Sequence, residues 1–344
     1  MRAFVLSAPR RGEVHDVEAP AARPGHVVVD IERVGLCGTD VEFFTGEMAY
    51  LHQGHAKYPM RLGHEWCGTV SAVGDGVDPA WIGSRTTGDT MVGCGTCQRC
   101  LTGRRHVCAD RLEIGIRGGF AGALAEKMSV PLRALRRLPD SVDAVAGALV
   151  EPGGNALRAL QGADLERGDR LLVLGPGTIG LLVALFALAH GAEVHIMGRS
   201  ATSLDFARSL GVHGAWTIES LPDLPFDAVV DASDSDALPA LALDLVEPGK
   251  RVVYVGLAPR PSTVDTRTLA LKDVTAVGIL SGSPGLASTI EHYASGAVDP
   301  RPLVAATVGL DEVADVLSGW RPSGAGPGPK IHVDPCTAVT RRAE

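Results

Sequence analysis

The chain has 344 residues, of which 45% are hydrophobic and 21% are charged, with 42 Gly and 22 Pro. This is the composition of a soluble globular protein with many turns, and the length suggests about two domains. The formal net charge of -8 argues against the basic surface by which proteins bind nucleic acid or anionic lipid.

The N-terminus, MRAFVLSAPRRGEV, has only a short apolar run and lacks the pattern of a secretion signal. We therefore expect the protein to be cytoplasmic, where disulfides are disfavoured. The uncharged stretch 171–189 imitates a membrane span, but Gly-Pro-Gly near its middle would break a spanning helix. We interpret it as a buried strand, a tight turn and a buried helix, and expect no membrane partner.

The predicted elements change character along the chain. Residues 2–137 contain short β-like runs separated by Gly and Pro, such as AFVL, HVVVDIERVG and CGTVSAVG. From about residue 169, strand-like and helix-like runs alternate, beginning with RLLVLG and GLLVALFALAHG. This alternation predicts a parallel sheet with crossover helices. After residue 282 come two helix-like runs and a closing strand, so we predict an α/β fold with a second, mostly β domain.

The stretch LGPGTIG places Gly175, Gly177 and Gly180 in a GxGxxG pattern, directly after an apolar strand and at the start of a helix. In that context the pattern indicates a dinucleotide-binding turn. Gly175 allows the turn, Gly177 leaves room for a pyrophosphate, and Gly180 lets helix and strand pack closely. Thr178 and Ile179 complete the turn, where free helix amides favour phosphate. The alternative is an ordinary glycine turn.

The end of the second strand, EVHIMG, bears on the choice between NAD and NADP. An acid at that point binds the ribose hydroxyls, whereas an arginine pairs with a 2′-phosphate. Glu193 stands at the opposite end of the strand, and Arg199 and Ser200 follow its tip. The sequence therefore favours NADP over NAD. The alternative is a solvated Arg199, with Asp205 playing no part.

A run of four cysteines, Cys94, Cys97, Cys100 and Cys108, follows the pattern C-x2-C-x2-C-x7-C. This spacing lets four thiolates surround one Zn(II) ion as a tetrahedron. Such a site carries a net charge of about -2 and has no open position, so we predict a structural zinc and not a catalytic one. Its binding would stabilise the fold by on the order of 10 kcal/mol.

Other residues that could bind a metal lie apart in the sequence. Cys37 is in GLCGTD, His64 and Glu65 are in GHEWCG, and Glu151 is in VEPGGNAL. A cysteine, a histidine and one carboxylate would leave a fourth zinc position open, as catalytic zinc requires. Taken singly, Cys37, His64 and Glu151 could equally be a buried thiol, a core histidine and an acid at a helix start. Spacing alone leaves both interpretations open.

Together, the motifs GLCGTD, GHEWCGTV, CGTCQRCLTGRRHVC, EPGGNAL and GPGTIG stand in the order found in a known family. The chain resembles, over nearly its whole length, the zinc-containing medium-chain dehydrogenase/reductase family, which includes alcohol, sorbitol and threonine dehydrogenases. The resemblance implies a Rossmann domain, at 153–282, inserted into a chaperonin-10-like catalytic domain at 1–152 and 283–344.

The same resemblance implies two Zn(II) ions per chain, one structural and one catalytic. Cys37, His64 and Glu151 would hold the catalytic ion, and Glu65 would lie beside it as an exchangeable ligand or a neighbouring carboxylate. Thr39 would take the proton of the alcohol. A glutamate at 151 looks more like the polyol and threonine dehydrogenases, because alcohol dehydrogenases have a cysteine at that position.

One departure from the family concerns the proton relay. Many relatives have CGTDxH, whose histidine passes the proton to solvent, but this chain reads CGTDVE and places Glu42 there. A carboxylate can also relay a proton. His52 and His55 could substitute, although we interpret them as surface residues. The implied reaction is reversible hydride transfer between NADP and a secondary alcohol: a polyol, sugar, amino-cyclitol or hydroxy amino acid.

Three alternatives share part of this pattern. A zinc-free quinone or enone reductase of the same fold has no use for Cys37, His64 and Glu151. A non-catalytic relative, such as a lens crystallin-type protein, would keep the fold without turnover. A zinc-ribbon interaction module would explain the four cysteines alone. The resemblance favours a small-molecule alcohol or ketone as substrate and a homodimer or homotetramer as the assembly.

Overall fold

The computed structural model describes residues 1–337, and the chain forms two compact units. Unit 1 consists of Met1–Glu151, Val304–Gly326 and 330–337, and unit 2 of Pro152–Leu303 and Pro327–Pro329. The first segment of unit 1 ends at Glu151, next to the start of helix α5 (Val150–Ala163). Residues 338–344 of the predicted catalytic domain lie outside the described residues.

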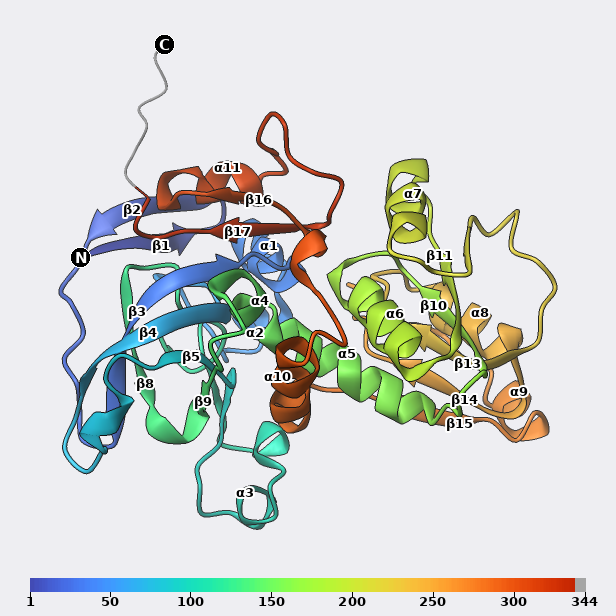
Figure 1. The fold of residues 1–344 in the computed structure, drawn as a ribbon, viewed down its shortest axis with the longest axis horizontal. Helices are drawn as coiled ribbons and strands as arrows, with labels where there is room; N and C mark the ends of the chain where they lie inside the picture. The colour runs from blue at the N-terminus through green and yellow to red at the C-terminus, as the bar shows by residue number, and fades with distance from the viewer. Residues whose placement is uncertain (338–344) are drawn as a thin grey trace. The chain divides into compact units, whose positions relative to one another are not determined.

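Among the described residues, unit 1 is built on a seven-stranded sheet of order β16-β17-β3-β4-β5-β9, with β8 also on β3. Its pairs are antiparallel except for β16 with β17. Figure 1 shows β3, β4 and β5 side by side in this unit. The strands of unit 1 are β1 (Arg2–Ala8), β2 (Arg11–Asp16), β3 (His26–Gly35), β4 (Glu65–Val73), β5 (Arg85–Gly88), β6 (Met91–Val92), β7 (Leu112–Glu113), β8 (Lys127–Pro131), β9 (Leu135–Arg137), β16 (Val304–Val308) and β17 (Lys330–Val333).

The helices of unit 1 are short and lie in its connections. The core packs Val27, Val29 and Ile31 of β3 against Trp66 and Phe43, all of them almost fully buried. Helix α3 stands on a loop that leaves the sheet (Figure 1). These helices are α1 (Gly38–Thr45), α2 (Ala49–His52), α3 (Gln98–Leu101), α4 (Ala144–Ala148) and α11 (Val313–Leu317), with 3-10 turns at Pro79–Trp81, Arg105–Val107, Leu132–Ala134 and Leu310–Glu312.

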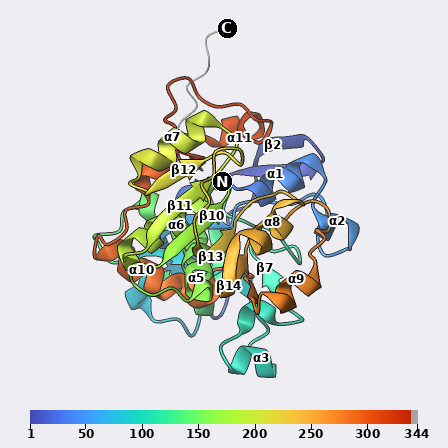
Figure 2. The same ribbon diagram turned by 90° about the vertical axis from the view of Figure 1, so that its right-hand side faces the viewer.

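Unit 2 contains a six-stranded, wholly parallel sheet of order β12-β11-β10-β13-β14-β15 within residues 1–337. Figure 2 shows β11, β10, β13 and β14 next to one another in this sheet. The prediction of an α/β fold with a parallel sheet is therefore confirmed. The strands are β10 (Arg170–Leu174), β11 (Glu193–Met197), β12 (Gly214–Trp216), β13 (Phe226–Asp231), β14 (Val246–Tyr254) and β15 (Thr275–Gly278).

Four helices of unit 2, between residues 178 and 271, lie in the crossovers between its strands, since parallel neighbours cannot be joined by tight turns. Of the other two described helices, one precedes β10 and one follows β15. The helices are α5 (Val150–Ala163, whose first two residues belong to unit 1), α6 (Thr178–His190), α7 (Ala201–Ser209), α8 (Leu238–Leu245), α9 (Thr266–Leu271) and α10 (Leu286–Ala294), with 3-10 turns at Ser283–Gly285 and Arg301–Leu303.

The uncharged stretch 171–189 forms most of β10 and helix α6, whose residues are largely buried. This is the strand, turn and helix expected from its Gly-Pro-Gly. No helix in the described part of the chain has the length and apolarity that a membrane crossing needs.

Helix α10 belongs to unit 2, whereas the sequence placed residues from 283 onward in the catalytic domain. Its Tyr293 ring stacks on Phe186 of α6 with centroids 6.0 Å apart. A side chain at Gly153 of α5 would overlap the Tyr293 hydroxyl, so α5 and α10 approach closely. This packing places the end of unit 2 at Leu303 and not at residue 282.

Candidate active site

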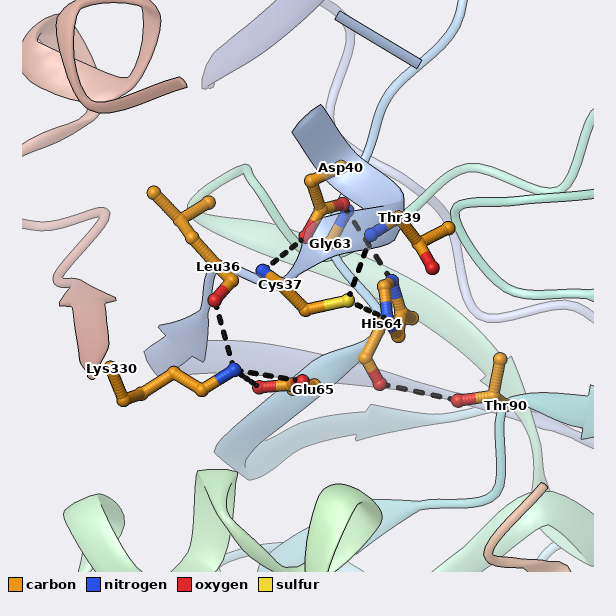
Figure 3. Close-up of polar contacts among 9 residues, drawn as sticks. All are labelled: Leu36, Cys37, Thr39, Asp40, Gly63, His64, Glu65, Thr90 and Lys330. Atoms are coloured by element: carbon orange, nitrogen blue, oxygen red, sulfur yellow. Dashed lines mark hydrogen bonds and ion pairs between the residues drawn. The ribbon is translucent and has the colours of Figure 1, made fainter. Parts of the chain in front are cut away.

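Cys37 and His64 are brought together by two neighbouring strands, β3 and β4. Cys37 follows the end of β3 and caps helix α1, and its sulfur accepts a hydrogen bond from the Thr39 amide at 3.3 Å. His64 immediately precedes β4. The Cys37 Sγ and His64 Nε2 atoms are 3.2 Å apart, and the sulfur points toward the histidine ring (Figure 3). Two atoms that are good ligands for zinc therefore point at one location.

Asp40 lies on the other side of the histidine ring. Its carboxylate accepts hydrogen bonds from the Cys37 amide at 3.0 Å and from the Gly63 amide at 3.3 Å. The Asp40 Oδ1 atom, which accepts from Gly63, is 3.6 Å from Nδ1 of His64. The histidine ring therefore presents its other nitrogen, Nε2, to the Cys37 sulfur. A carboxylate in this place fixes the orientation of a metal-binding histidine and raises its basicity. Among the described residues, ligand atoms of Cys37, Asp40 and His64 all lie within 4.8 Å of one another.

The electrostatics of this group suit a cation. Burial alone would lower the pKa of His64, but the nearby Cys37 and Asp40 outweigh it and raise that pKa well above its ordinary value. Burial also raises the pKa of Asp40, which His64 partly opposes. Nδ1 of His64 is buried and has no hydrogen bond within the usual limits. These residues fit a zinc ion, which would neutralise the cluster.

Glu151 is buried at the start of α5, with 8% of its surface exposed. Its charge helps to raise the pKa of His64, so it lies within electrostatic range of the histidine. Within residues 1–337, Glu151 does not belong to the group of Cys37, Asp40 and His64, whose ligand atoms lie within 4.8 Å of one another.

Glu65 is held by Lys330, a residue 265 positions away that the sequence analysis did not identify. The lysine Nζ donates to the two carboxylate oxygens at 2.9 and 2.7 Å and to the Leu36 carbonyl at 2.9 Å (Figure 3). Both side chains are buried. The Glu65 carboxylate lies against Gly35 of β3, where any Cβ would overlap it. Glu65 therefore places a carboxylate near His64, and the charge of this carboxylate is balanced by Lys330.

The residues proposed for proton transfer lie on helix α1. Thr39 is half-buried in its first turn, and Glu42 is half-buried one turn later. Burial and the neighbouring Glu47 raise the pKa of Glu42 above its ordinary value. His52 and His55 are exposed, and the His52 ring contacts only the Gly46 carbonyl among its recorded hydrogen bonds in the described chain.

The four cysteines of the run converge on a second location. Their sulfur atoms all lie within 4.8 Å of one another, with Cys94 and Cys100 3.9 Å apart and Cys97 and Cys108 3.7 Å apart. All four are free thiols. Hydrogen bonds from Thr96 and Cys97 lower the pKa of Cys94 to about 6. A hydrogen bond from the Gly95 amide acts to lower the pKa of Cys100, but burial and the neighbouring thiols outweigh it and raise that pKa to about 11. The arrangement fits a tetrahedral zinc ion with no open position.

The glycine turn lies between β10 and α6 in unit 2. Gly175 has a φ of +100°, which favours glycine, and a Cβ at Gly180 would overlap the Gly175 carbonyl. A Cβ at Gly177 would meet nothing within 4 Å, so the space above the helix start is open. Thr178 and Ile179 form the first turn of α6. Phosphate binds favourably at such a helix start.

The tip of β11 carries no acid. Arg199 is exposed, and no ion pair of its guanidinium is recorded in residues 1–337. Ser200 caps α7, its oxygen accepting from the Ser203 amide at 3.5 Å. Glu193 is at the opposite end of the strand and pairs with Arg170 at 2.8 Å.

A pocket of about 300 Å³ lies at the carboxyl ends of β13 and β14, where parallel sheets bind ligands. No motif in the sequence predicted this pocket. Ser233 and Asp231 line it, and Ser233 also lies next to the glycine turn, since a Cβ on Gly175 would be 3.2 Å from the Ser233 Cα. The other lining residues include Ser235, Pro239, Tyr254, Gly256, Leu257, Ala258, Arg260, Ser262 and Val264.

Comparison with known proteins identifies the family. Residues 23–140 match the model "Alcohol dehydrogenase GroES-like domain", and residues 178–295 match "Zinc-binding dehydrogenase". L-threonine 3-dehydrogenase of Idiomarina loihiensis is 31% identical over 275 residues, which cover 77% of this chain and 79% of that protein. The chain belongs to the zinc-containing medium-chain dehydrogenase/reductase family.

Solved structures of medium-chain dehydrogenases agree with this assignment. A zinc-binding dehydrogenase from Sinorhizobium meliloti, bound to NADP, is 27% identical with a TM-score of 0.88, covering 97% of this chain and 99% of that one. Galactitol-1-phosphate dehydrogenase from Escherichia coli is 25% identical with a TM-score of 0.87, covering 97% and 100%. The family, the fold and the prediction of an NAD(P)-dependent oxidoreductase are therefore confirmed.

Within this dehydrogenase, sequence analysis missed Asp40 and Lys330. A signal for Asp40 existed, because an acid three residues after a helix cap is typical of a capping box. No local pattern connects Lys330 with Glu65.

Proposed function

We propose that the protein is a zinc-dependent oxidoreductase that transfers hydride between a secondary alcohol and NADP. The observation that carries the proposal is the convergence of Cys37 Sγ and His64 Nε2 at 3.2 Å, with Asp40 behind the imidazole. Glu151, whose charge acts on His64, would complete a set of three ligands. Three protein ligands leave the fourth position free for substrate.

When bound, the zinc ion would supply a Lewis acid that makes the substrate hydroxyl easier to ionise, and NADP would supply the hydride acceptor. The chain's own residues do the rest. Asp40 holds the His64 ring in place, and Lys330 neutralises Glu65 so that this carboxylate does not add charge at the metal. The Thr39 hydroxyl takes the proton of the alcohol, and Glu42 receives it one helical turn further on.

The four cysteines would hold the second zinc ion of each chain. With all four positions taken by sulfur, this ion has a structural role. We also expect a cytoplasmic location, because the four thiols must remain reduced to bind metal.

We favour NADP because the tip of β11 offers Arg199 and Ser200 and no carboxylate. An exposed guanidinium without a recorded ion-pair partner in the described chain is available to a 2′-phosphate. The S. meliloti relative that was solved with NADP supports this choice.

The relatives support a proposal for the substrate class. A glutamate at position 151, together with the similarity to threonine and galactitol-1-phosphate dehydrogenases, favours polyols, sugars, amino-cyclitols and hydroxy amino acids over simple alcohols.

We further propose that the protein is a homodimer formed at the edge of the parallel sheet. Strand β15 pairs only with β14 among the described residues, and it is largely exposed. Leu271 and Leu280, which flank it in sequence, are 82% and 40% exposed. An edge strand presents unpaired backbone N–H and C=O groups, which favour pairing with another chain. Ala276→Lys should give a monomer by light scattering, and an unchanged mass would contradict the interface.

The decisive experiment is a panel of secondary alcohols and their ketones, assayed with NAD and with NADP on protein of measured zinc content. We expect two zinc ions per chain and turnover that is faster with NADP. His64→Ala should abolish turnover and remove one ion, while Cys97→Ser should remove the other. One zinc ion per chain, with reduction of quinones or enones that survives His64→Ala, would instead identify a reductase that uses no catalytic zinc.

A further inference from the structure

Arg111 is a partly buried side chain that joins the four-cysteine site to other parts of unit 1. It follows the last cysteine of the run by three residues, and its Nη1 donates to the Cys108 carbonyl at 3.3 Å. Its side chain is only 14% exposed. The guanidinium therefore packs directly against the backbone of a proposed zinc ligand.

The other guanidinium nitrogens of Arg111 hold two residues from elsewhere. Nε donates to Glu113 Oε1 at 2.8 Å, and Nη2 donates to the Tyr50 hydroxyl at 3.3 Å. The Tyr50 hydroxyl in turn donates to the same Glu113 oxygen at 3.3 Å. Glu113 is 3% exposed, so Arg111 is the counter-ion of a buried carboxylate.

From Glu113 the contacts continue to His64. The next residue, Ile114, donates its amide hydrogen to the Thr90 carbonyl at 3.0 Å, and the Thr90 hydroxyl donates to the His64 carbonyl at 3.3 Å (Figure 3). Gly115 lies against Gly63, since a Cβ there would be 2.8 Å from the Gly63 carbonyl oxygen.

From Tyr50 the contacts reach the helix that Cys37 caps. Tyr50 lies in α2, which follows α1 after a tight turn in which the Glu42 carbonyl accepts from three successive amides, those of Gly46, Glu47 and Met48. The Tyr50 carbonyl accepts from the amides of His55 and Ala56 and so organises the following loop.

We propose that Arg111 is a positioning residue. It couples the four-cysteine site, in the state in which all four sulfurs bind one metal ion, to the placement of residues 46–64. The proposal rests on the proposed function in one respect, namely that a metal ion closes the four-cysteine site. A planar guanidinium donates from three separate nitrogens in fixed, diverging directions, whereas an ammonium donates from a single nitrogen. If the site opens, Cys108 moves, Arg111 loses its anchor, and Tyr50 and Glu113 lose their shared partner.

The experiment compares Arg111→Met and Arg111→Lys with Arg99→Met as a matched control. Arg99 also donates from Nη1 to a backbone carbonyl of the cysteine loop, that of Val107 at 2.9 Å, but it is exposed and has no recorded bond to Tyr50 or Glu113 in the described chain. Amide hydrogen exchange is measured by mass spectrometry on zinc-loaded protein.

We expect Arg111→Met to speed exchange in residues 46–56 and 112–118 about tenfold or more, as loss of a charge-assisted hydrogen bond implies. Arg111→Lys should rescue only part of the protection, and Arg99→Met should change neither segment. Strands β10 and β13 of unit 2 should be unaffected in all three variants. Equal acceleration throughout the chain would mean a purely structural role and would overturn the proposal.

Coupling is tested by combining Arg111→Met with Cys97→Ser, which removes the metal from the four-cysteine site. Cys97→Ser alone should loosen residues 46–56 as Arg111→Met does, and the double variant should add little to either, because both break one connection. Additive effects would refute the coupling. If Cys97→Ser does not fold, a chelator is used to open the four-cysteine site in the wild type and in Arg111→Met. Faster exchange in 46–56 of the wild type with little further change in Arg111→Met supports the coupling, and additive effects refute it. Exchange needs no turnover, so a failed alcohol panel would leave this result readable.

Discussion

Removing the positive charge of Lys330 should destabilise the protein far more than removing a similar charge from its surface. Lys330→Met keeps most of the side-chain length but leaves the Glu65 carboxylate buried without a counter-ion and the Leu36 carbonyl without its donor. The Lys330 and Glu65 side chains are only 3% and 4% exposed. Breaking one partner of a buried pair costs about 3–5 kcal/mol.

A matched control is present in the same unit. Lys127 donates to Asp30 at 2.6 Å, about as short as the Lys330 pair, but these side chains are 37% and 45% exposed. Lys127→Met should therefore cost only about 0–1 kcal/mol. The double variant Lys330→Met with Glu65→Leu should recover much of the stability, since replacing a whole buried pair by apolar groups is often close to neutral.

The assay is urea unfolding of zinc-saturated protein, followed by tryptophan fluorescence. Trp66 follows Glu65 directly and is fully buried in the core of unit 1, so its emission reports on this region. If Lys330→Met and Lys127→Met lower the free energy of unfolding by similar amounts, burial does not determine the strength of this ion pair and the reasoning fails.

Three further predictions concern the active site and cofactor. Asp40→Asn should weaken zinc binding by Cys37 and His64 about 10- to 100-fold, as changes next to a metal-binding histidine usually do, and competition with a chelator measures this. Because the pKa of Glu42 is raised, its carboxylate ionises only at a pH above the ordinary range, and kcat/KM should fall as the pH drops through that pKa. In Glu42→Gln this fall of kcat/KM at low pH should disappear. If it persists, another residue relays the proton. Arg199→Ala should lower kcat/KM for NADP about tenfold or more and leave that for NAD nearly unchanged, since one charge-assisted contact is lost; equal losses with both cofactors would contradict the role of Arg199.

Local patterns in the sequence predicted much of the fold. The strand, Gly-Pro-Gly and helix around Gly175 and the four cysteines each lie within about twenty residues, so neighbouring side chains determine their geometry. The strand alternation of 169–278 predicted the parallel sheet for the same reason. In the structure the sulfur atoms of the four cysteines lie within 4.8 Å of one another, as their spacing in the sequence predicted.

The contacts that complete the site depend on tertiary packing. Lys330 reaches Glu65 only because β17 pairs with β3, and that pairing joins the last strand of the described chain to one near its start. The grouping of α10 with unit 2 has a related cause, because the contact of Tyr293 with Phe186 follows from two helices that meet after folding. A single sequence gives no local signal for either contact.

The lack of a side chain at Gly35 has a consequence for interpreting the sequences of homologues. Because the Glu65 carboxylate occupies the room that a side chain at 35 would need, the glycine, the glutamate and the lysine at 330 can change only as a set. A homologue with alanine or a larger residue at 35 must have turned its glutamate elsewhere. This one small residue therefore indicates, from sequence alone, which relatives can keep the carboxylate in a buried ion pair with the lysine.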